Sequence, residues 1–165
     1  MLSGNHEDMA CDGRWPIGED RFFCVVVDND DNDDEYLLWM QNLRRFYVEG
    51  NTIFVHAGIE EEAGDMWEWG TDDFTLTEKY PAQIGKFQCD EQDMKIVAGH
   101  VGTAVISGDS RYHDIYYDGY SHYYIDATTL DSGIINVLKV DVESDKYYRV
   151  AESGEWLIFP YDDEN

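Results

Sequence analysis

Three short apolar segments of this chain each run into a turn that carries a histidine. The junctions are Leu2-Ser3-Gly4-Asn5-His6, Thr52-Ile53-Phe54-Val55-His56 and Lys95-Ile96-Val97-Ala98-Gly99-His100. Because glycine lets the backbone turn tightly, such junctions can aim side chains into one cleft. The helix, turn and strand leading to His56 are typical of a βαβ-like unit, in which functional side chains lie at the carboxyl ends of strands. The junctions therefore predict an α/β fold with its chemistry at one sheet edge.

The side chains at these junctions are an amide and several imidazoles. An amide oxygen and neutral imidazole nitrogens suit a borderline divalent metal such as Mn, Fe or Zn. We therefore predict that the junctions carrying Asn5-His6, His56 and His100 together form one metal site.

Each junction also has a structural interpretation when it is taken alone. Asn5 is equally suited to cap the start of a short helix, with Glu7 and Asp8 favouring the helix dipole in the first turn. A single histidine at a strand end is more often structural than a ligand, so an α/β domain with purely structural histidines is an alternative. His113 and His122 lie in a polar hairpin region and are expected on the surface.

The charge of the chain limits its partners. Among 165 residues there are 36 acidic and 11 basic side chains, which gives a net charge of -25. The chain lacks the cationic surface that nucleic acid or an anionic membrane requires, so neither is an expected partner. The same field repels anionic substrates, and any phosphate chemistry would need local cations such as metal ions.

Length and composition indicate a single domain over residues 1–165. The three cysteines, Cys11, Cys24 and Cys89, show no paired spacing and are expected to be reduced thiols. The sequence shows neither a basic leader with an apolar core nor an apolar run of about 20 residues, so we expect a cytoplasmic protein.

Apolar patterns predict further elements. The amphipathic spacing over Glu35–Val48 predicts a helix, with Arg44 and Arg45 near its end where the dipole favours cations. From Ala104 onward the chain is strand-like, and Asp118-Gly119 marks a hairpin turn. Other expected strands span 134–142, 147–150 and 156–159.

Two segments near the amino terminus are less easily interpreted. Phe22–Val27 could be a strand or a buried segment, because periodicity does not decide between them. The acidic run Asp28–Glu35 fails the calcium-loop pattern, since Asp33 and Trp39 stand where glycine and glutamate are required. A solvated loop that ends in a helix cap is the better interpretation of this run.

The motifs together resemble a known family. Gly4-Asn5-His6-Glu7, His56-Ala57-Gly58 and Gly99-His100, in this order and each after an apolar strand, are similar to the later motifs of the calcineurin-like metallophosphoesterases. The resemblance is greatest to the branch of bacterial serine/threonine protein phosphatases and diadenosine tetraphosphatases. It extends to the expected helix over 35–47, to Phe54–Ile59 and to Tyr124-Ile125-Asp126, and it covers residues 2 to about 142.

The resemblance implies a fold, a reaction and roles for residues. The implied fold is α/β (α+β), a two-sheet β-sandwich flanked by helices. The implied reaction is hydrolysis of phosphate esters at a dinuclear metal centre, with a phosphoprotein or nucleotide as substrate. Asn5, His56 and His100 would hold one of the two metals, and His6 would be the general acid that protonates the leaving oxygen.

The chain departs from the family pattern at its start. Two opening motifs, Gly-Asp-x-His-Gly and Gly-Asp-x-x-Asp-Arg-Gly, are absent from the sequence and are expected upstream of Leu2. The resemblance therefore implies a domain truncated at its amino terminus, with half of the active site and several strands missing. A homodimer or a complementing chain could cover the exposed sheet edge. The alternative is a non-catalytic remnant that serves as a structural or interaction module with at most one weak metal site.

Overall fold

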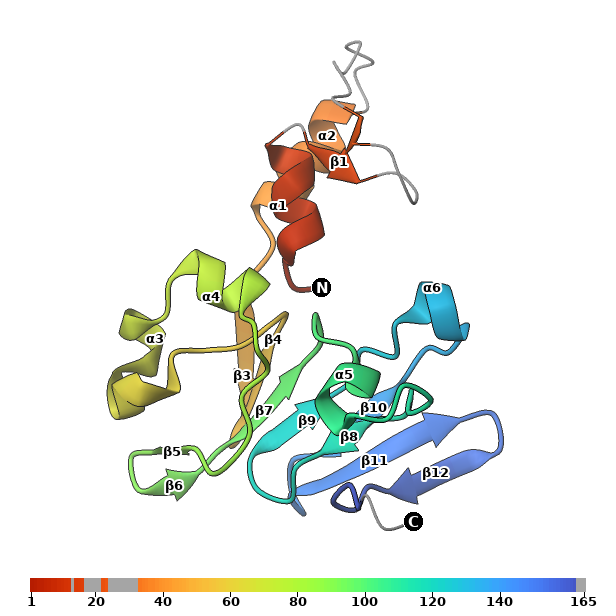
Figure 1. Ribbon diagram of the computed structural model, residues 1–165. Coiled ribbons are helices and arrows are strands. Elements are labelled where there is room, and N and C mark those ends of the chain that lie inside the picture. Colours follow the sequence, from red (N-terminus) through yellow and green to blue (C-terminus); the bar gives the residue numbers. More distant parts are fainter. Residues whose placement is uncertain (13, 17–21, 24–32, 163–165) are drawn as a thin grey trace.

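The computed structural model describes residues 1–12, 14–16, 22–23 and 33–162 of the chain. A five-stranded sheet in the order β3-β4-β7-β9-β8 forms its centre (Figure 1). The strands are β3 (Phe46–Glu49), β4 (Thr52–Val55), β7 (Lys95–Ala98), β8 (Tyr116–Tyr117) and β9 (His122–Tyr124). The three inner strands β4, β7 and β9 run parallel, whereas the edge strands pair antiparallel with their neighbours.

A second sheet packs against one face of the central sheet. It consists of the antiparallel strands β10 (Leu138–Asp141), β11 (Lys146–Ala151) and β12 (Gly154–Leu157). Tyr147 of β11 is buried between the sheets, where its ring stacks on that of Tyr123 at a centroid distance of 4.3 Å. Its hydroxyl forms a hydrogen bond of 2.5 Å with Thr52 Oγ1. The two sheets therefore share an aromatic core.

The opposite face of the central sheet packs against helical segments. Because strand side chains alternate between faces, Ile53 and Val55 point to this side while Phe54 points to the second sheet. Trp67 of α3 (Trp67–Gly70) and Leu76 of α4 (Asp73–Glu78) cover these aliphatic side chains. The molecule is thus a mixed α/β structure with a core on each face of its central sheet, as the sequence predicts at this level.

The helices are short, and two small hairpins stand apart from the main sheets. The helical elements are α1 (Asn5–Cys11), α2 (Asp33–Gln41), the 3₁₀ helix η1 (Glu61–Met66), α3 (Trp67–Gly70), α4 (Asp73–Glu78), α5 (Thr103–Ser107) and α6 (Thr129–Ser132). The hairpins pair β1 (Trp15–Pro16) with β2 (Phe22–Phe23) and β5 (Gln88–Cys89) with β6 (Gln92–Asp93). No helix in the described part of the chain is long and apolar enough to cross a membrane.

The predicted helix over Glu35–Val48 is wrong in its second half. The helix ends at Gln41, and Phe46–Glu49 forms strand β3 instead. The reason is tertiary: this aromatic and β-branched segment pairs with β4 through a tight turn in which Gly50 has a φ of +59°. Strand pairing and burial outweigh a helical pattern of this kind.

The strand-like interpretation of the chain from Ala104 is also wrong, because Thr103–Ser107 forms α5. Gly102 precedes this helix and accepts the amide hydrogens of Val105 and Ile106, while Gly108, at a φ of +75°, ends it. The helix occupies the crossover between the parallel strands β7 and β9, which requires a connection of this type.

Several strand predictions are confirmed. Strands at 52–55 and 95–98 occur as β4 and β7, and β8 and β9 form the hairpin around Asp118-Gly119. The strand expected over 134–142 begins only at Leu138. Of the ambiguous Phe22–Val27 segment, β2 contains the first two residues, and positions 24–27 lie outside the described residues, as do positions 28–32 of the acidic run.

Replacing Ile53 with alanine tests the core between the sheet and the helices. Ile53 is 0% exposed, so Ile53→Ala leaves a cavity and is expected to lower the free energy of unfolding by about 2–5 kcal/mol. Ile135 is 75% exposed, and the control Ile135→Ala should stay within about 0.5 kcal/mol of the parent. Urea unfolding followed by tryptophan fluorescence measures both variants. Equal losses in the two variants would contradict the core described here.

Candidate metal centre

The register of the parallel strands brings two of the predicted site residues to one edge. Phe54 of β4 pairs with Val97 of β7, which pairs with Tyr123 of β9, so the three strands end at the same level. The backbone amide of Gly99 donates to the carbonyl oxygen of His56 at 2.9 Å, which continues the pairing by one residue. The turns that follow the strands therefore start side by side at the carboxyl edge of the sheet.

Helix α1 is attached to this edge through the start of the chain. The amide of Ser3 donates to the carbonyl of Arg44 at 2.9 Å. The neighbouring Arg45 Nη1 donates to Asp8 Oδ1 at 2.6 Å and to Ser3 Oγ at 3.2 Å, so one guanidinium contacts the chain on both sides of the start of the helix. These contacts fix the first turn of α1, which carries Asn5 and His6.

The interpretation of Asn5 as a helix cap is wrong. The cap position is Gly4, Asn5 is already helical, and Glu7 Oε2 accepts the Gly4 amide at 2.8 Å. The Asn5 side chain turns instead toward the sheet, where its Oδ1 lies 3.0 Å from His56 Nε2. Because a Cβ at position 4 would lie 2.6 Å from His56 Nδ1, the close approach of α1 to the imidazole requires glycine there.

His100 lies beside His56 at the same edge. The ring centroids are 5.2 Å apart and the ring planes are inclined by 60°. His100 has a φ of +64°, a left-handed conformation that is uncommon outside glycine and aims its side chain from a tight turn. The structure thus brings together Asn5, His56 and His100. His56 follows Asn5 by 51 positions, and His100 follows His56 by 44.

The surroundings of His56 favour its neutral form. Burial lowers the pKa of His56 below its ordinary value, and the neighbouring His100 and His6 act in the same direction. Glu7 and Asp126 oppose this shift but do not outweigh it. A neutral imidazole nitrogen is the form that binds metals. His6 itself is exposed on the first turn of α1, near enough to His56 to influence its pKa.

A second group of potential ligands lies elsewhere, in Asp65, Cys89 and Asp90. Two observations make it a poor match for a metal. Asp65 Oδ1 already accepts the Asp90 amide at 2.7 Å, and burial, followed by the nearby carboxylates, raises the pKa of the Cys89 thiol away from the thiolate that metals require. Both aspartates are also exposed.

Comparison of the chain with protein-family models, curated proteins and solved structures finds no match. The metal and acid roles of Asn5, His6, His56 and His100 therefore stay predictions that depend on the geometry above.

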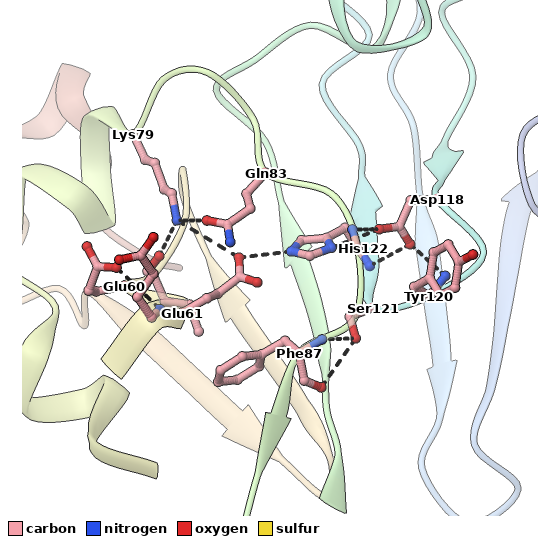
Figure 2. Close-up of polar contacts among 12 residues, drawn as sticks. Glu60, Glu61, Lys79, Gln83, Phe87, Asp118, Tyr120, Ser121 and His122 are labelled. Carbon is pink, nitrogen blue, oxygen red and sulfur yellow. Dashed lines mark hydrogen bonds and ion pairs between the residues drawn. The ribbon is translucent and has the colours of Figure 1, made fainter. Parts of the chain in front are cut away.

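The prediction that His122 lies on the surface is wrong, because its side chain is 1% exposed. Figure 2 shows its ring between two carboxylates on the helical side of β9. Nδ1 lies 2.9 Å from Asp118 Oδ2, and Nε2 lies 3.0 Å from Glu61 Oε1. The carboxylate side chains are 3% and 8% exposed. His113, also expected on the surface, is half-buried, and its Nδ1 has no hydrogen-bond partner among the described residues.

Both ring nitrogens of His122 face carboxylate oxygens, so both must carry hydrogen for the two bonds to form, and the ring is an imidazolium. Burial alone would lower the pKa of His122, but its bonds to Asp118 and Glu61 outweigh this effect and raise the pKa to about 9. Burial alone would raise the pKa of Asp118. Its bonds to His122 and to backbone amides outweigh this effect, so the pKa of Asp118 is lowered.

Lys79 extends this arrangement toward the strand end. Its Nζ lies 3.9 Å from Glu61 Oε1, donates to Gln83 Oε1 at 2.7 Å and donates to the carbonyl oxygen of Ile59. We call Asp118, His122, Glu61 and Lys79 the ion cluster. It pairs two carboxylates with two cations, which is the condition under which buried charges are tolerated.

A sequence signal for the ion cluster exists in retrospect. Asp118 and His122 flank the turn between two aromatic strands, and period-2 alternation places His122 on the same face as the buried Tyr124. The sequence does not reveal that Glu61, 61 positions earlier, provides the second acceptor.

The ion cluster predicts a loss of stability at alkaline pH. The folded-state pKa of His122, about 9, lies above its ordinary value of 6.5. Protonation therefore stabilises the folded state fully below pH 6.5, and this contribution is lost as the pH rises through 9, by about 3 kcal/mol. Urea unfolding at a series of pH values from 6 to 10 measures the loss.

Two isosteric variants serve as test and control. Glu61→Gln removes one carboxylate and lets a neutral His122 accept from the amide, so the alkaline loss should shrink. Glu62→Gln changes an exposed carboxylate on the same 3₁₀ helix and should retain the loss. The same pH dependence in parent and Glu61→Gln would contradict this account of His122.

Proposed function

We propose that the chain is a metal-dependent phosphoesterase domain of the calcineurin-like type, with serine/threonine phosphatase-like chemistry. In this proposal Asn5, His56 and His100 bind one divalent ion, Mn, Fe or Zn, and His6 is the general acid. The observation that carries the proposal is the convergence of Asn5 Oδ1 and His56 Nε2 to 3.0 Å, with the His100 ring beside them. The face-to-face packing of two sheets with helices outside supports the corresponding two-sheet sandwich.

The donor atoms fit a metal ion in spacing and in charge. The Asn5 oxygen and the His56 nitrogen lie 3.0 Å apart, at hydrogen-bonding distance, so both could contact one ion placed between them. The lowered pKa of His56 favours the neutral ring. Nε2 donates its hydrogen to Asn5 Oδ1 in this structure, so metal binding at Nε2 would require the tautomer with hydrogen on Nδ1.

In the proposed phosphate ester hydrolysis, different residues of the chain have separate roles. A bound divalent cation supplies Lewis acidity toward phosphate oxygens and makes water nucleophilic near neutral pH. His6, exposed at the same edge, is suited to donate a proton to the leaving oxygen. Arg45 and the Glu7–Gly4 bond fix the helix turn that presents Asn5 and His6. The expected substrate is a phosphoprotein or a nucleotide.

One observation favours the alternative, a non-catalytic module with a single weak metal site. In the described part of the chain, no aspartate or glutamate joins His56 and His100 in a three-ligand group within 4.8 Å. A dinuclear centre needs carboxylates that compensate the charge of two ions, whereas three neutral ligands suffice only for one. The alternative predicts metal binding without turnover.

Hydrolysis of an activated aryl phosphate in excess Mn²⁺ tests the proposal. We expect metal-dependent turnover, because the three ligands and the acid lie at one edge. His6→Ala should lower kcat by about 10²–10⁴-fold, since a positioned general acid contributes an effect of this size. His56→Ala should abolish metal binding measured by calorimetry.

His113→Ala is the matched control, since His113 is a half-buried histidine outside the proposed centre, and its turnover should equal that of the parent. Metal binding at Asn5 and His56 without turnover would favour the non-catalytic module. Turnover that survives His56→Ala would show that the chemistry lies elsewhere.

A further inference from the structure

We propose that the ion cluster is a positioning device for His56, which fixes the segment after β4 only while His122 is protonated. The consequence for catalysis rests on the proposed function, whereas the positioning itself does not. His122, Glu61 and Lys79 touch none of the proposed metal ligands and are positioning residues.

The segment that leaves His56 is fixed by the burial of Ile59 and by polar contacts at Ala57, Ile59, Glu60 and Glu61. At Glu60 the backbone amide donates to Thr71 Oγ1 at 2.9 Å. The amide of Ala57 donates to the carbonyl of Leu76 in α4 at 2.9 Å. The Lys79 ammonium then bonds the carbonyl of Ile59, and Glu61 bonds His122 of β9 (Figure 2). The contacts at Ile59 and Glu61 belong to the ion cluster. They contribute to the direction in which the chain leaves His56, together with the burial of Ile59 and the bonds at Ala57 and Glu60.

The Lys79 side chain also lies directly against this segment. A Cβ at Gly58 would lie 2.5 Å from Lys79 Cδ, so the aliphatic part of Lys79 occupies the space that any other residue would fill. Lys79 therefore contacts the chain at Gly58 through its methylenes and at Ile59 through its ammonium. A displacement of Lys79 or of Glu61 breaks the bond to Ile59 or the bond to His122, and so removes a contact of the segment that follows His56.

The contacts within the ion cluster depend on the protonation state of His122. The groups that face its ring are Asp118 from the β8–β9 turn, Glu61 from η1 and the parallel ring of Tyr124 at 6.0 Å, and Lys79 acts on it through Glu61. With His122 protonated the cluster is neutral. Without that proton one ring nitrogen becomes an acceptor facing a carboxylate, and the two buried carboxylates are then balanced only by the single positive charge of Lys79. Glu61, on the short 3₁₀ helix, is then released.

Histidine NMR of the ¹⁵N-labelled full chain without added metal tests the proposal. From pH 6 to 10, we expect the His122 ring to titrate near pH 9, where its pKa lies, and the His56 ring signals to show an inflection at the same midpoint. The lowered pKa of His56 places its own titration below its ordinary value of 6.5, so an inflection near pH 9 does not arise from protonation of the His56 ring. His56 signals that stay flat through the titration of His122 would overturn the proposal, whatever the variants do.

A variant with neutral His122 provides the second test. In Glu61→Gln the amide can donate to Nε2 of a neutral imidazole, so the contact persists without a charge, and the alkaline inflection of His56 should vanish. Glu62→Gln changes the exposed neighbour and should retain the inflection at the parent midpoint. An inflection that persists unchanged in Glu61→Gln would also overturn the proposal.

The two proposals fail separately in a parallel assay of aryl phosphate hydrolysis with Mn²⁺. A His56 inflection in a protein without turnover refutes the phosphoesterase and retains the positioning device. Turnover in a protein whose His56 signals show no inflection during the titration of His122 refutes the positioning device and retains the phosphoesterase.

Discussion

The parallel pairing of β4, β7 and β9 is the constraint on which the rest of the structure depends. Parallel strands end at a common edge, and here the turns after β4 and β7 carry His56 and His100. Helix α1 completes the edge, because Gly4 lets the backbone approach the imidazole and brings the Asn5 amide within 3.0 Å of it. Strand register and the close backbone approach at Gly4 thus bring together three segments that lie far apart in the sequence.

The same edge is supported by buried charge. Apolar packing against α3 and α4 fixes the strands and also buries Ile59 in the segment after β4. Lys79 and His122 add polar contacts to this segment at Ile59 and at Glu61. Buried ion clusters add little net stability compared with apolar substitutes, yet removal of one partner is costly. A chain with a net charge of -25 gains a further advantage, since each buried carboxylate in the ion cluster faces a cation.

The sequence predicts the inner strands and the meeting of the histidines, because apolar β-branched runs followed by glycine are local signals. It fails at Phe46–Glu49, where pairing with β4 outweighs a helical pattern, and at Thr103–Ser107, where a crossover imposes a helix on β-branched residues. It also fails at His122, because burial there depends on Glu61 from a distant segment, and no local pattern encodes that contact.

The central claim is that one metal ion binds where the ends of β4 and β7 meet the start of α1. A crystal structure of the full chain soaked with Mn²⁺, with anomalous difference density collected near the manganese edge, tests it most directly. The account predicts one strong peak within bonding distance of Asn5 Oδ1, His56 Nε2 and a His100 ring nitrogen. Density confined to Asp65, Cys89 and Asp90, with none between His56 and His100, would contradict it.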